Sequence, residues 1–255
     1  MRPLGAVMRT LGPMSGAAWA ALALAGVAAI GDVGTAGAAE DPGKATAPRM
    51  EFIPPPPGSY KLQKIQRVSD AALLDSTGRT VRLAALTQDK ITLLTFFYTY
   101  CVDPLGCPFA HVTLADLRDR VSEDRSLAGR VRFVSISLDP THDSPAAIAG
   151  YGREFAVDPN FEWRFLTARR VPELLPVLDD FGQDVSVEMD ENRRATRTLH
   201  HMLKMFLIDA HGEVREIYTL AFVQPQVMFN DIKTLALEAG RSHGAARNDR
   251  AGRQL

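Results

Sequence analysis

The chain has 255 residues, of which 46% are hydrophobic and 23% are charged, so it can form one well-packed core and still carry tails. Its formal net charge of -1 gives no electrostatic basis for binding nucleic acid. The composition therefore indicates one globular domain and gives no reason to expect a nucleic-acid partner.

The N-terminus has the pattern of an export signal. Arg2 and Arg9 precede an apolar run of small residues from Gly16 to Ile30, and the sequence Ala-Gly-Ala follows at 36–38 as a candidate cleavage site. We expect residues 1–38 to be a signal peptide, with an uncleaved membrane anchor as the alternative. Both alternatives export the domain into an oxidising compartment, where a cysteine pair can also serve as a structural disulfide.

A proline-rich linker is expected at residues 39–64. The run from Pro54 to Pro57 favours the extended polyproline II conformation, which makes a semi-rigid spacer. The globular domain is expected at residues 65–240. The last segment, 241–255, is basic and has no hydrophobic periodicity, so we expect a disordered tail there.

The domain is expected to begin with a β-hairpin, because apolar runs flank the turn sequence from Asp75 to Gly78. A buried strand follows at Ile91–Tyr98, and an amphipathic helix begins at Pro108. A second core strand at Val131–Leu138 leads into a helix that begins at Pro145. Two successive strand and helix units predict an α/β fold with parallel neighbours in its central sheet.

The second half of the domain contains weaker signals. The expected elements are a strand at Trp163–Thr167, a helix at 171–181, an antiparallel strand pair at Leu203–Asp209 and Val214–Leu220, and a closing helix at Pro225–Ala239. Residues 182–200 are polar, with Arg193, Arg194 and Arg197 close together. We expect a solvated loop there, and a docking patch for an acidic partner is the alternative.

Both cysteines lie on the turn between the first buried strand and its helix. Cys101 follows the strand, and Cys107 stands at the start of the helix. Because the unpaired N–H groups of a helix N-terminus favour a thiolate, we expect a lowered pKa for Cys107. A strand, two thiols and a helix in this order form the thioredoxin-type arrangement, which serves thiol exchange or the binding of soft metals.

An imidazole that joined the two thiols would complete a soft-metal site. Two thiolates and one imidazole select copper(I), and they also accept zinc or copper(II). The candidates are His201 and its neighbour His200, which directly precede the strand that starts at Leu203. In a thioredoxin-like sheet, the loop that enters this strand lies beside the cysteine turn.

Three segments together resemble the Sco/SenC family of thioredoxin-fold copper proteins. They are Phe96 to Pro108 with both cysteines, Ser137 to Pro145, and His201 to Asp209. Their order and separations fit the family over roughly Val68 to Ala239. The resemblance implies a thioredoxin-like fold with a central mixed sheet, and a copper ion held by Cys101, Cys107 and His201.

The resemblance also implies a function. Proteins of this family are copper chaperones, periplasmic or anchored to the inner membrane, that help to assemble the binuclear copper centre of cytochrome c oxidase. Some roles in the family involve reduction of the thiols at that centre. The implied partners are the copper-bearing subunit of the oxidase or another periplasmic copper protein, together with a thiol-disulfide reductant.

The spacing of the cysteines departs from the family pattern. Five residues, Val102 to Gly106, separate the two thiols, whereas the family usually has three. A turn that contains Pro104 and Gly106 can still bring the sulfurs together, because a disulfide or a shared metal requires only Cα atoms within about 7 Å. The longer turn changes the ligand angles, which affects copper affinity and redox potential.

Several alternatives remain open at this stage. His111 lies one helical turn after Cys107 and is an alternative or additional ligand, and His200 is a candidate for orienting His201. The chain is alternatively a thiol-disulfide oxidoreductase without a role in copper delivery, or a domain with a purely structural disulfide. Three methionines are expected in the core rather than as thioether ligands: Met202, Met205 and Met228.

Overall fold

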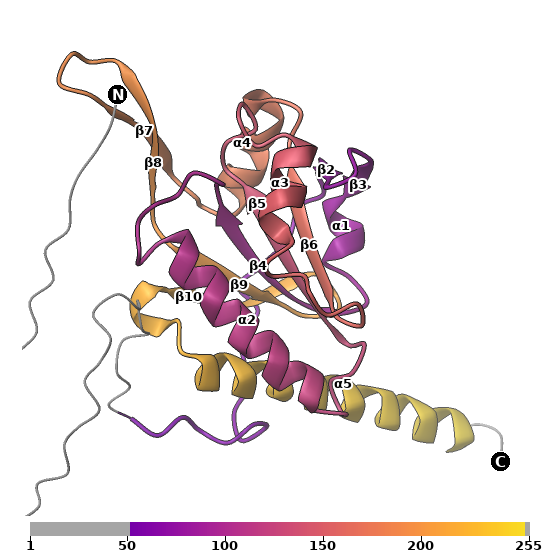
Figure 1. Cartoon of the computed structure of the whole chain (residues 1–255). Helices are drawn as coiled ribbons and strands as arrows, with labels where there is room; N and C mark the ends of the chain where they lie inside the picture. Colours follow the sequence, from indigo (N-terminus) through magenta and orange to yellow (C-terminus); the bar gives the residue numbers. More distant parts are fainter. Residues whose placement is uncertain (1–51, 253–255) are drawn as a thin grey trace, which may run out of the picture. The chain divides into compact units, whose positions relative to one another are not determined.

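The computed structural model describes residues 52–252, so the expected signal peptide lies outside the described residues. At the centre of the described part is an eight-stranded mixed sheet with helices on both faces (Figure 1). The expected α/β architecture is therefore confirmed. Within residues 52–252, no helix combines the length and the apolar character that a membrane crossing needs.

The central sheet has a parallel middle and antiparallel edges. Its strands, in chain order, are β1 (Gln66–Arg67), β2 (Ala72–Asp75), β3 (Thr80–Arg82), β4 (Ile91–Phe97), β5 (Val131–Ser137), β6 (Glu162–Thr167), β9 (Lys204–Ile208) and β10 (Glu213–Thr219). In space they follow the order β1-β10-β9-β4-β5-β6-β2-β3. Strand β4 pairs parallel with β5 and antiparallel with β9, so the chain segment before the cysteine turn lies in the middle of the sheet.

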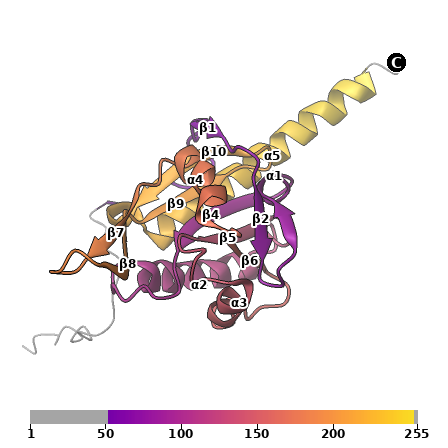
Figure 2. The same cartoon turned by 90° about the horizontal axis from the view of Figure 1, so that it is seen from above.

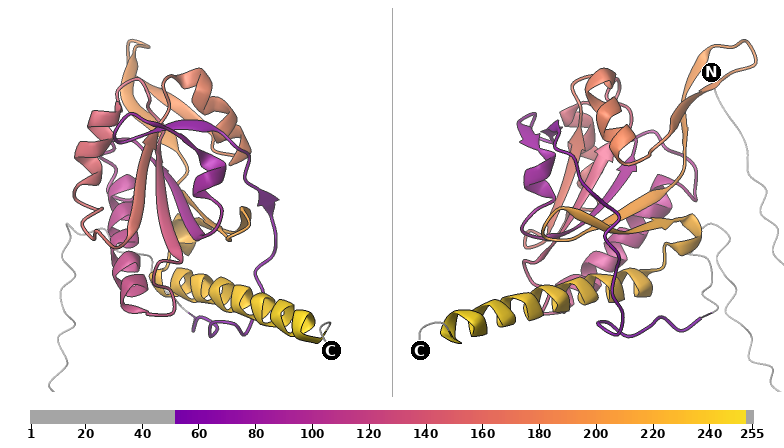
Figure 3. Two further views of the ribbon diagram at one scale, coloured as in Figure 1. Left: turned by 90° about the vertical axis from the view of Figure 1, so that its right-hand side faces the viewer. Right: turned by 180° about the vertical axis from the view of Figure 1, so that it is seen from behind.

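Helices cover both faces of this sheet (Figure 3). They are α1 (Leu83–Leu86), α2 (Cys107–Glu123), α3 (Pro145–Gly152), α4 (Val171–Asp180), the 3₁₀ helix η1 (Leu220–Phe222) and α5 (Pro225–Gly252). Every residue of β4 is buried, because Leu93 and Phe97 pack with α2 and α5 while Leu94 and Phe96 pack with α4. Burial on both faces explains why the strand is a continuous apolar run.

The predicted hairpin near the start of the domain is present as β2 and β3. The carboxylate of Asp75 accepts hydrogen bonds from the backbone N–H groups of Thr77 at 2.9 Å and Arg79 at 3.0 Å. Gly78 takes the positive φ of 84° that closes the turn and that side chains disfavour.

A second hairpin replaces the solvated loop expected at residues 182–200, so that expectation was wrong. It consists of β7 (Val185–Met189) and β8 (Ala195–His201), which pair antiparallel and project beyond the central sheet (Figure 1). The carboxylate of Asp190 closes its turn by accepting the backbone N–H of Arg194 at 2.8 Å. The sequence did not predict this hairpin because the side chains of β7 and β8 are all at least partly exposed. The alternation of apolar and polar residues along the two strands is therefore weak.

The last helix is longer than expected. It begins at Pro225 as predicted but continues to Gly252, so the disordered tail expected at 241–255 was wrong for residues 241–252 (Figure 2). The first part of α5 packs on the sheet through Met228 and Ile232, which are fully buried. Once a packed segment supplies the helix nucleus, adding further turns costs little, even without periodicity.

The proline-rich linker is partly docked on α5 and is not a free spacer over its whole length. The backbone N–H of Gly58 donates to the hydroxyl of Thr234 at 2.9 Å, and the hydroxyl of Tyr60 donates to Asp231 at 2.5 Å. Leu62 belongs to the main core. The domain therefore begins before residue 65, and the boundary expected there lies too far along the chain.

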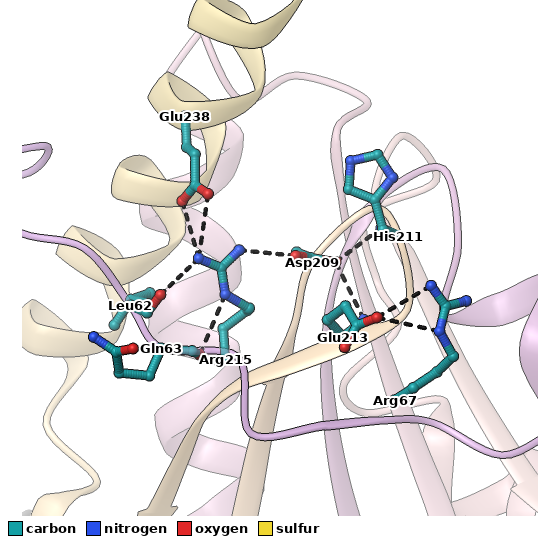
Figure 4. A network of polar contacts seen from close by, with 8 residues as sticks. All are labelled: Leu62, Gln63, Arg67, Asp209, His211, Glu213, Arg215 and Glu238. Carbon is teal, nitrogen blue, oxygen red and sulfur yellow. Dashed lines mark hydrogen bonds and ion pairs between the residues drawn. The ribbon is translucent and has the colours of Figure 1, made fainter.

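A buried arginine ties this linker to the sheet and to α5 (Figure 4). Arg215 of β10 donates to the carbonyl of Leu62 at 2.7 Å and pairs with Asp209 at 2.8 Å and Glu238 at 3.1 Å. Because the side chains of Arg215 and Asp209 are both almost fully buried, removal of Arg215 would leave the carboxylate of Asp209 uncompensated, which typically costs about 3 to 5 kcal/mol. The linker is thus held to the domain by charge as well as by packing.

Candidate metal and thiol site

The start of the cysteine turn is held by Asp143. Its buried carboxylate accepts hydrogen bonds from the backbone N–H of Thr99 at 3.0 Å, the hydroxyl of Thr99 at 2.5 Å and the hydroxyl of Ser137 at 2.6 Å. The turn after β4 is therefore fastened to the end of β5. The sequence marked Asp143 only as part of the segment from Ser137 to Pro145, and its positioning role appears from the contacts.

The longer turn does bring the two cysteines together. The backbone N–H of Cys107 donates to Cys101 Sγ at 3.4 Å, and both thiols are free. Gly106 permits this approach, because a Cβ atom at this position would lie 3.1 Å from Cys101 Sγ and 3.3 Å from the carbonyl of Asp103. The five-residue separation thus does not keep the thiols apart.

The two thiols differ in ionisation, because the pKa of Cys101 is lowered and that of Cys107 is raised. The thiol of Cys107 donates to Cys101, and backbone N–H groups and the hydroxyl of Tyr98 add further hydrogen bonds, which lowers the pKa of Cys101 to about 6. The pKa of Cys107 is raised, because its proton is held by Cys101 and its side chain is only 1% exposed. The lowered pKa expected for Cys107 was wrong: its backbone N–H at the start of α2 stabilises the neighbouring sulfur instead.

A cavity of about 890 Å³ lies between the cysteine turn and the base of the second hairpin. Figure 1 shows the two segments side by side near the start of α2. The residues that line the cavity include Tyr98, Cys101, Asp103, Leu105, Gly106, His200, His201, Met202 and Leu220. Cys101 and His201, which are far apart in the sequence, therefore face a common space.

His201 is arranged to act as a neutral nitrogen donor. Its Nδ1 lies 3.2 Å from the carbonyl of Met202, a contact that places the ring proton on Nδ1 and the lone pair on Nε2. Burial lowers the pKa of His201, so the ring is uncharged at neutral pH. The ring of Tyr98 lies edge-on to that of His201, with centroids 6.2 Å apart. Tyr98 thus contacts both Cys101 and His201, a role that its place in an apolar run did not reveal.

The three expected ligands are near one another but not assembled. Cys107 lies behind Cys101 and is not part of the cavity lining. Within residues 52–252, no three His, Cys, Asp or Glu side chains are close enough to hold a metal ion together. A thiolate, a thiol and a neutral imidazole do fit the preferences of a soft ion. Joining them requires movement of the cysteine turn or of the hairpin base.

An arginine links these two segments. The guanidinium of Arg197 on β8 lies over the ring of Tyr100, 4.4 Å from its centroid. An exposed cation–π contact of this kind contributes about 0.5 to 1 kcal/mol, which is enough to favour an arrangement without locking it. Of the three arginines expected to form a cluster, Arg194 instead pairs with Asp190 at 3.0 Å.

The two other candidate histidines differ in position, since His111 lies in the core and His200 lies at the rim of the cavity. His111 is completely buried, with Nδ1 2.9 Å from the carbonyl of Cys107 and Nε2 3.2 Å from the hydroxyl of Ser135. Burial lowers its pKa to about 4, so it is a neutral core residue with both nitrogens engaged. His200 is exposed at the cavity rim, 3.9 Å from Glu188.

The methionines divide into two groups. Met205 and Met228 are fully buried, as expected. Met202 is 60% exposed and lines the cavity, so the expectation that it packs in the core was wrong. It lies on the connection between β8 and β9, where the alternation of strand side chains does not apply.

The close approach at Gly106 predicts the effect of adding one methyl group. Gly106→Ala should push Cys101 Sγ away from the N–H of Cys107, which weakens that hydrogen bond. We expect the pH midpoint of Cys101 alkylation to rise by about one pH unit. Mass spectrometry of protein treated with iodoacetamide at a series of pH values measures this midpoint. Gly240→Ala, which meets no atom within 4 Å, is the control, and an unchanged midpoint in Gly106→Ala would contradict the geometry.

Comparison with known proteins places the chain in a family. The sequence profile of SCO1/SenC matches residues 62–237. A comparison with curated proteins found no match. Among solved structures, the chain is similar to Arabidopsis thaliana ScoI with copper bound, with a TM-score of 0.56 and 21% identity over 67% of this chain and 98% of that one.

Two further structures are similar to the same extent. A SCO1/SenC family lipoprotein from Bacillus anthracis gives a TM-score of 0.57 and 23% identity over 67% of this chain and 95% of that one. BsSco gives a TM-score of 0.54 and 21% identity over 69% of this chain and 98% of that one. It is described as having a disulfide switch and as a member of the Sco family of cytochrome c oxidase assembly proteins. These similarities confirm the thioredoxin-like fold. The chain belongs to the SCO1/SenC family.

Proposed function

We propose that this protein is an exported copper chaperone that binds one copper ion through Cys101, Cys107 and His201. The observation that carries the proposal is that Cys101 and His201 face one cavity while Cys107 is hydrogen-bonded to Cys101 from behind. The relative from Arabidopsis thaliana, whose structure holds copper, supports the choice of metal.

The chemistry of the three side chains suits copper(I). Cys101 is a thiolate at neutral pH and His201 is a neutral imidazole, so neither has to lose a proton before it binds. Cys107 must release its proton, and the positive charge of the ion favours that release. Two sulfurs and one nitrogen form the soft donor set that copper(I) prefers, and the same set accepts copper(II).

Delivery is the second part of the proposal. The cavity opens between two segments that are joined by a weak contact, so a partner can reach the ion and accept it by stepwise ligand exchange. The recipient we propose is the copper-bearing subunit of cytochrome c oxidase or another periplasmic copper protein, in line with the description of BsSco. The N-terminal signal pattern and the lipoprotein relative support a periplasmic location, free or anchored to the inner membrane.

A second candidate function is thiol-disulfide exchange without copper delivery. The observation in its favour is the asymmetry of the thiols, with a reactive thiolate at Cys101 and a buried protonated thiol at Cys107. The Cys101 thiolate would attack a partner disulfide and release one partner thiolate. Cys107 would then lose its proton and attack the mixed disulfide, which leaves the partner reduced and the cysteine pair oxidised.

Anaerobic titration of the reduced protein with copper(I), in competition with a chromophoric chelator, tests the proposal. We expect one copper(I) per chain, and we expect the double variant Cys101→Ser/Cys107→Ser to lose it. Reduced wild-type protein that binds no copper(I), yet still reduces a protein disulfide, would refute copper binding and leave thiol exchange as the function.

A further inference from the structure

The cavity wall presents one soft donor that the proposed ligand set does not use. Met202 is 60% exposed and lines the same cavity as Cys101 and His201. A single exposed apolar side chain is ordinary on a protein surface, so exposure alone assigns no role. The position is what distinguishes Met202, because its thioether is a copper(I) ligand type and it directly follows the proposed imidazole ligand.

The same geometry separates Cys107 from the cavity. Cys107 is 1% exposed, is absent from the lining, and lies behind Cys101. An ion that arrives from solvent therefore meets the sulfur of Cys101, the imidazole of His201 and the thioether of Met202 before it meets Cys107. These three side chains supply two sulfurs and one nitrogen, the same donors as the proposed ligand set of Cys101, Cys107 and His201.

We propose that Met202 is an exchangeable third ligand that receives copper(I) together with Cys101 and His201, before Cys107 takes its place. The inference rests on the proposed copper-binding function. In the exchange, Cys107 loses its proton to solvent and binds as a thiolate, while the neutral thioether of Met202 leaves. No electron is transferred, and copper stays in its reduced state. Delivery would use the same exchange in reverse, with Met202 occupying the position that Cys107 vacates.

The chain offers a matched control in Met189. It is 59% exposed, almost the same as Met202, but lies on β7 of the second hairpin and is not part of the cavity lining. Leucine is close to methionine in volume and lacks sulfur, so Met202→Leu and Met189→Leu remove the thioether with little change in shape.

The test uses the full reduced protein with Cys107→Ser, which prevents the exchange. Its methionine methyl groups are labelled with carbon-13, and copper(I) is added anaerobically. We expect the methyl resonance of Met202, assigned by its loss in Met202→Leu, to shift with one equivalent of copper(I), while that of Met189 stays in place. Adding Met202→Leu to Cys107→Ser should weaken copper(I) binding by about 10-fold, and adding Met189→Leu should not.

The outcomes separate this inference from the proposed function. Two results would show that Met202 is no ligand, provided that wild-type protein binds copper(I). One is a Met202 methyl resonance that does not shift in Cys107→Ser, and the other is an unchanged copper(I) affinity when Met202→Leu is added to Cys107→Ser. In both cases the chaperone proposal stands. A Cys107→Ser variant that binds no copper(I) while wild-type protein does would also overturn the inference. If wild-type protein binds none, both proposals fall.

Discussion

Replacing His201 with alanine should weaken copper(I) binding by about 100-fold or more while leaving thiol exchange at the cysteines nearly unchanged. The imidazole is the one nitrogen donor of the proposed set, and it faces the cavity with its Nε2 lone pair available. The cysteines keep their own hydrogen bonds without it, because Cys101 is held by Cys107 and Tyr98. Chelator competition measures the affinity, and reduction of a model disulfide measures the exchange.

His200 provides the control for this substitution. It is also a histidine at the cavity rim, adjacent in sequence, and it lies near Glu188. His200→Ala should change copper(I) affinity by no more than a few-fold, as expected for a neighbour that only orients a ligand. A large loss in His200→Ala with little change in His201→Ala would move the nitrogen ligand from 201 to 200. Losses of copper(I) affinity of the same size in the two variants would show that both histidines contribute to binding.

The two thiols should differ in reactivity by a factor of about 1000 or more at pH 7. Cys101 has a lowered pKa of about 6 and reaches the cavity, so at pH 7 it is mainly thiolate. Cys107 is buried and its pKa is raised, so it stays protonated and shielded. The alkylation rate of Cys101 should therefore rise with pH around a midpoint near 6 and then level off.

Quantitative alkylation with iodoacetamide, followed by peptide mass spectrometry, resolves the two sites. Protein unfolded in denaturant is the control, because there both thiols should react at similar rates. Tyr98→Phe tests the cause, since loss of the hydroxyl removes one donor to Cys101 Sγ and should raise the midpoint. Faster alkylation of Cys107 than of Cys101 in the folded protein would contradict the assignment of roles.

Local signals in the sequence were sufficient for the framework of the site. The apolar run before Cys101 predicted β4, because a strand buried on both faces needs apolar side chains throughout. Pro108 predicted the start of α2 to within one residue. The resemblance to the Sco/SenC family named Cys101, Cys107 and His201, and in the structure Cys101 and His201 line the same cavity.

Properties that depend on tertiary packing were not predictable in the same way. The position of Cys107 at a helix N-terminus suggested a lowered pKa, but burial and its hydrogen bond to Cys101 raise it. The hairpin of β7 and β8 has too few buried side chains to leave a periodic signal. Met202 was expected in the core as one of the alternating positions of a strand, whereas the structure leaves it on the exposed connection between β8 and β9.

X-ray absorption at the copper edge tests the central claim most directly, because it counts the sulfur and nitrogen neighbours of the ion. For reduced wild-type protein loaded with one equivalent of copper(I), the account predicts two sulfurs and one nitrogen, and His201→Ala should lose the nitrogen. A wild-type spectrum without a nitrogen neighbour, or one that keeps it unchanged in His201→Ala, would contradict the claim that Cys101, Cys107 and His201 meet at a single ion.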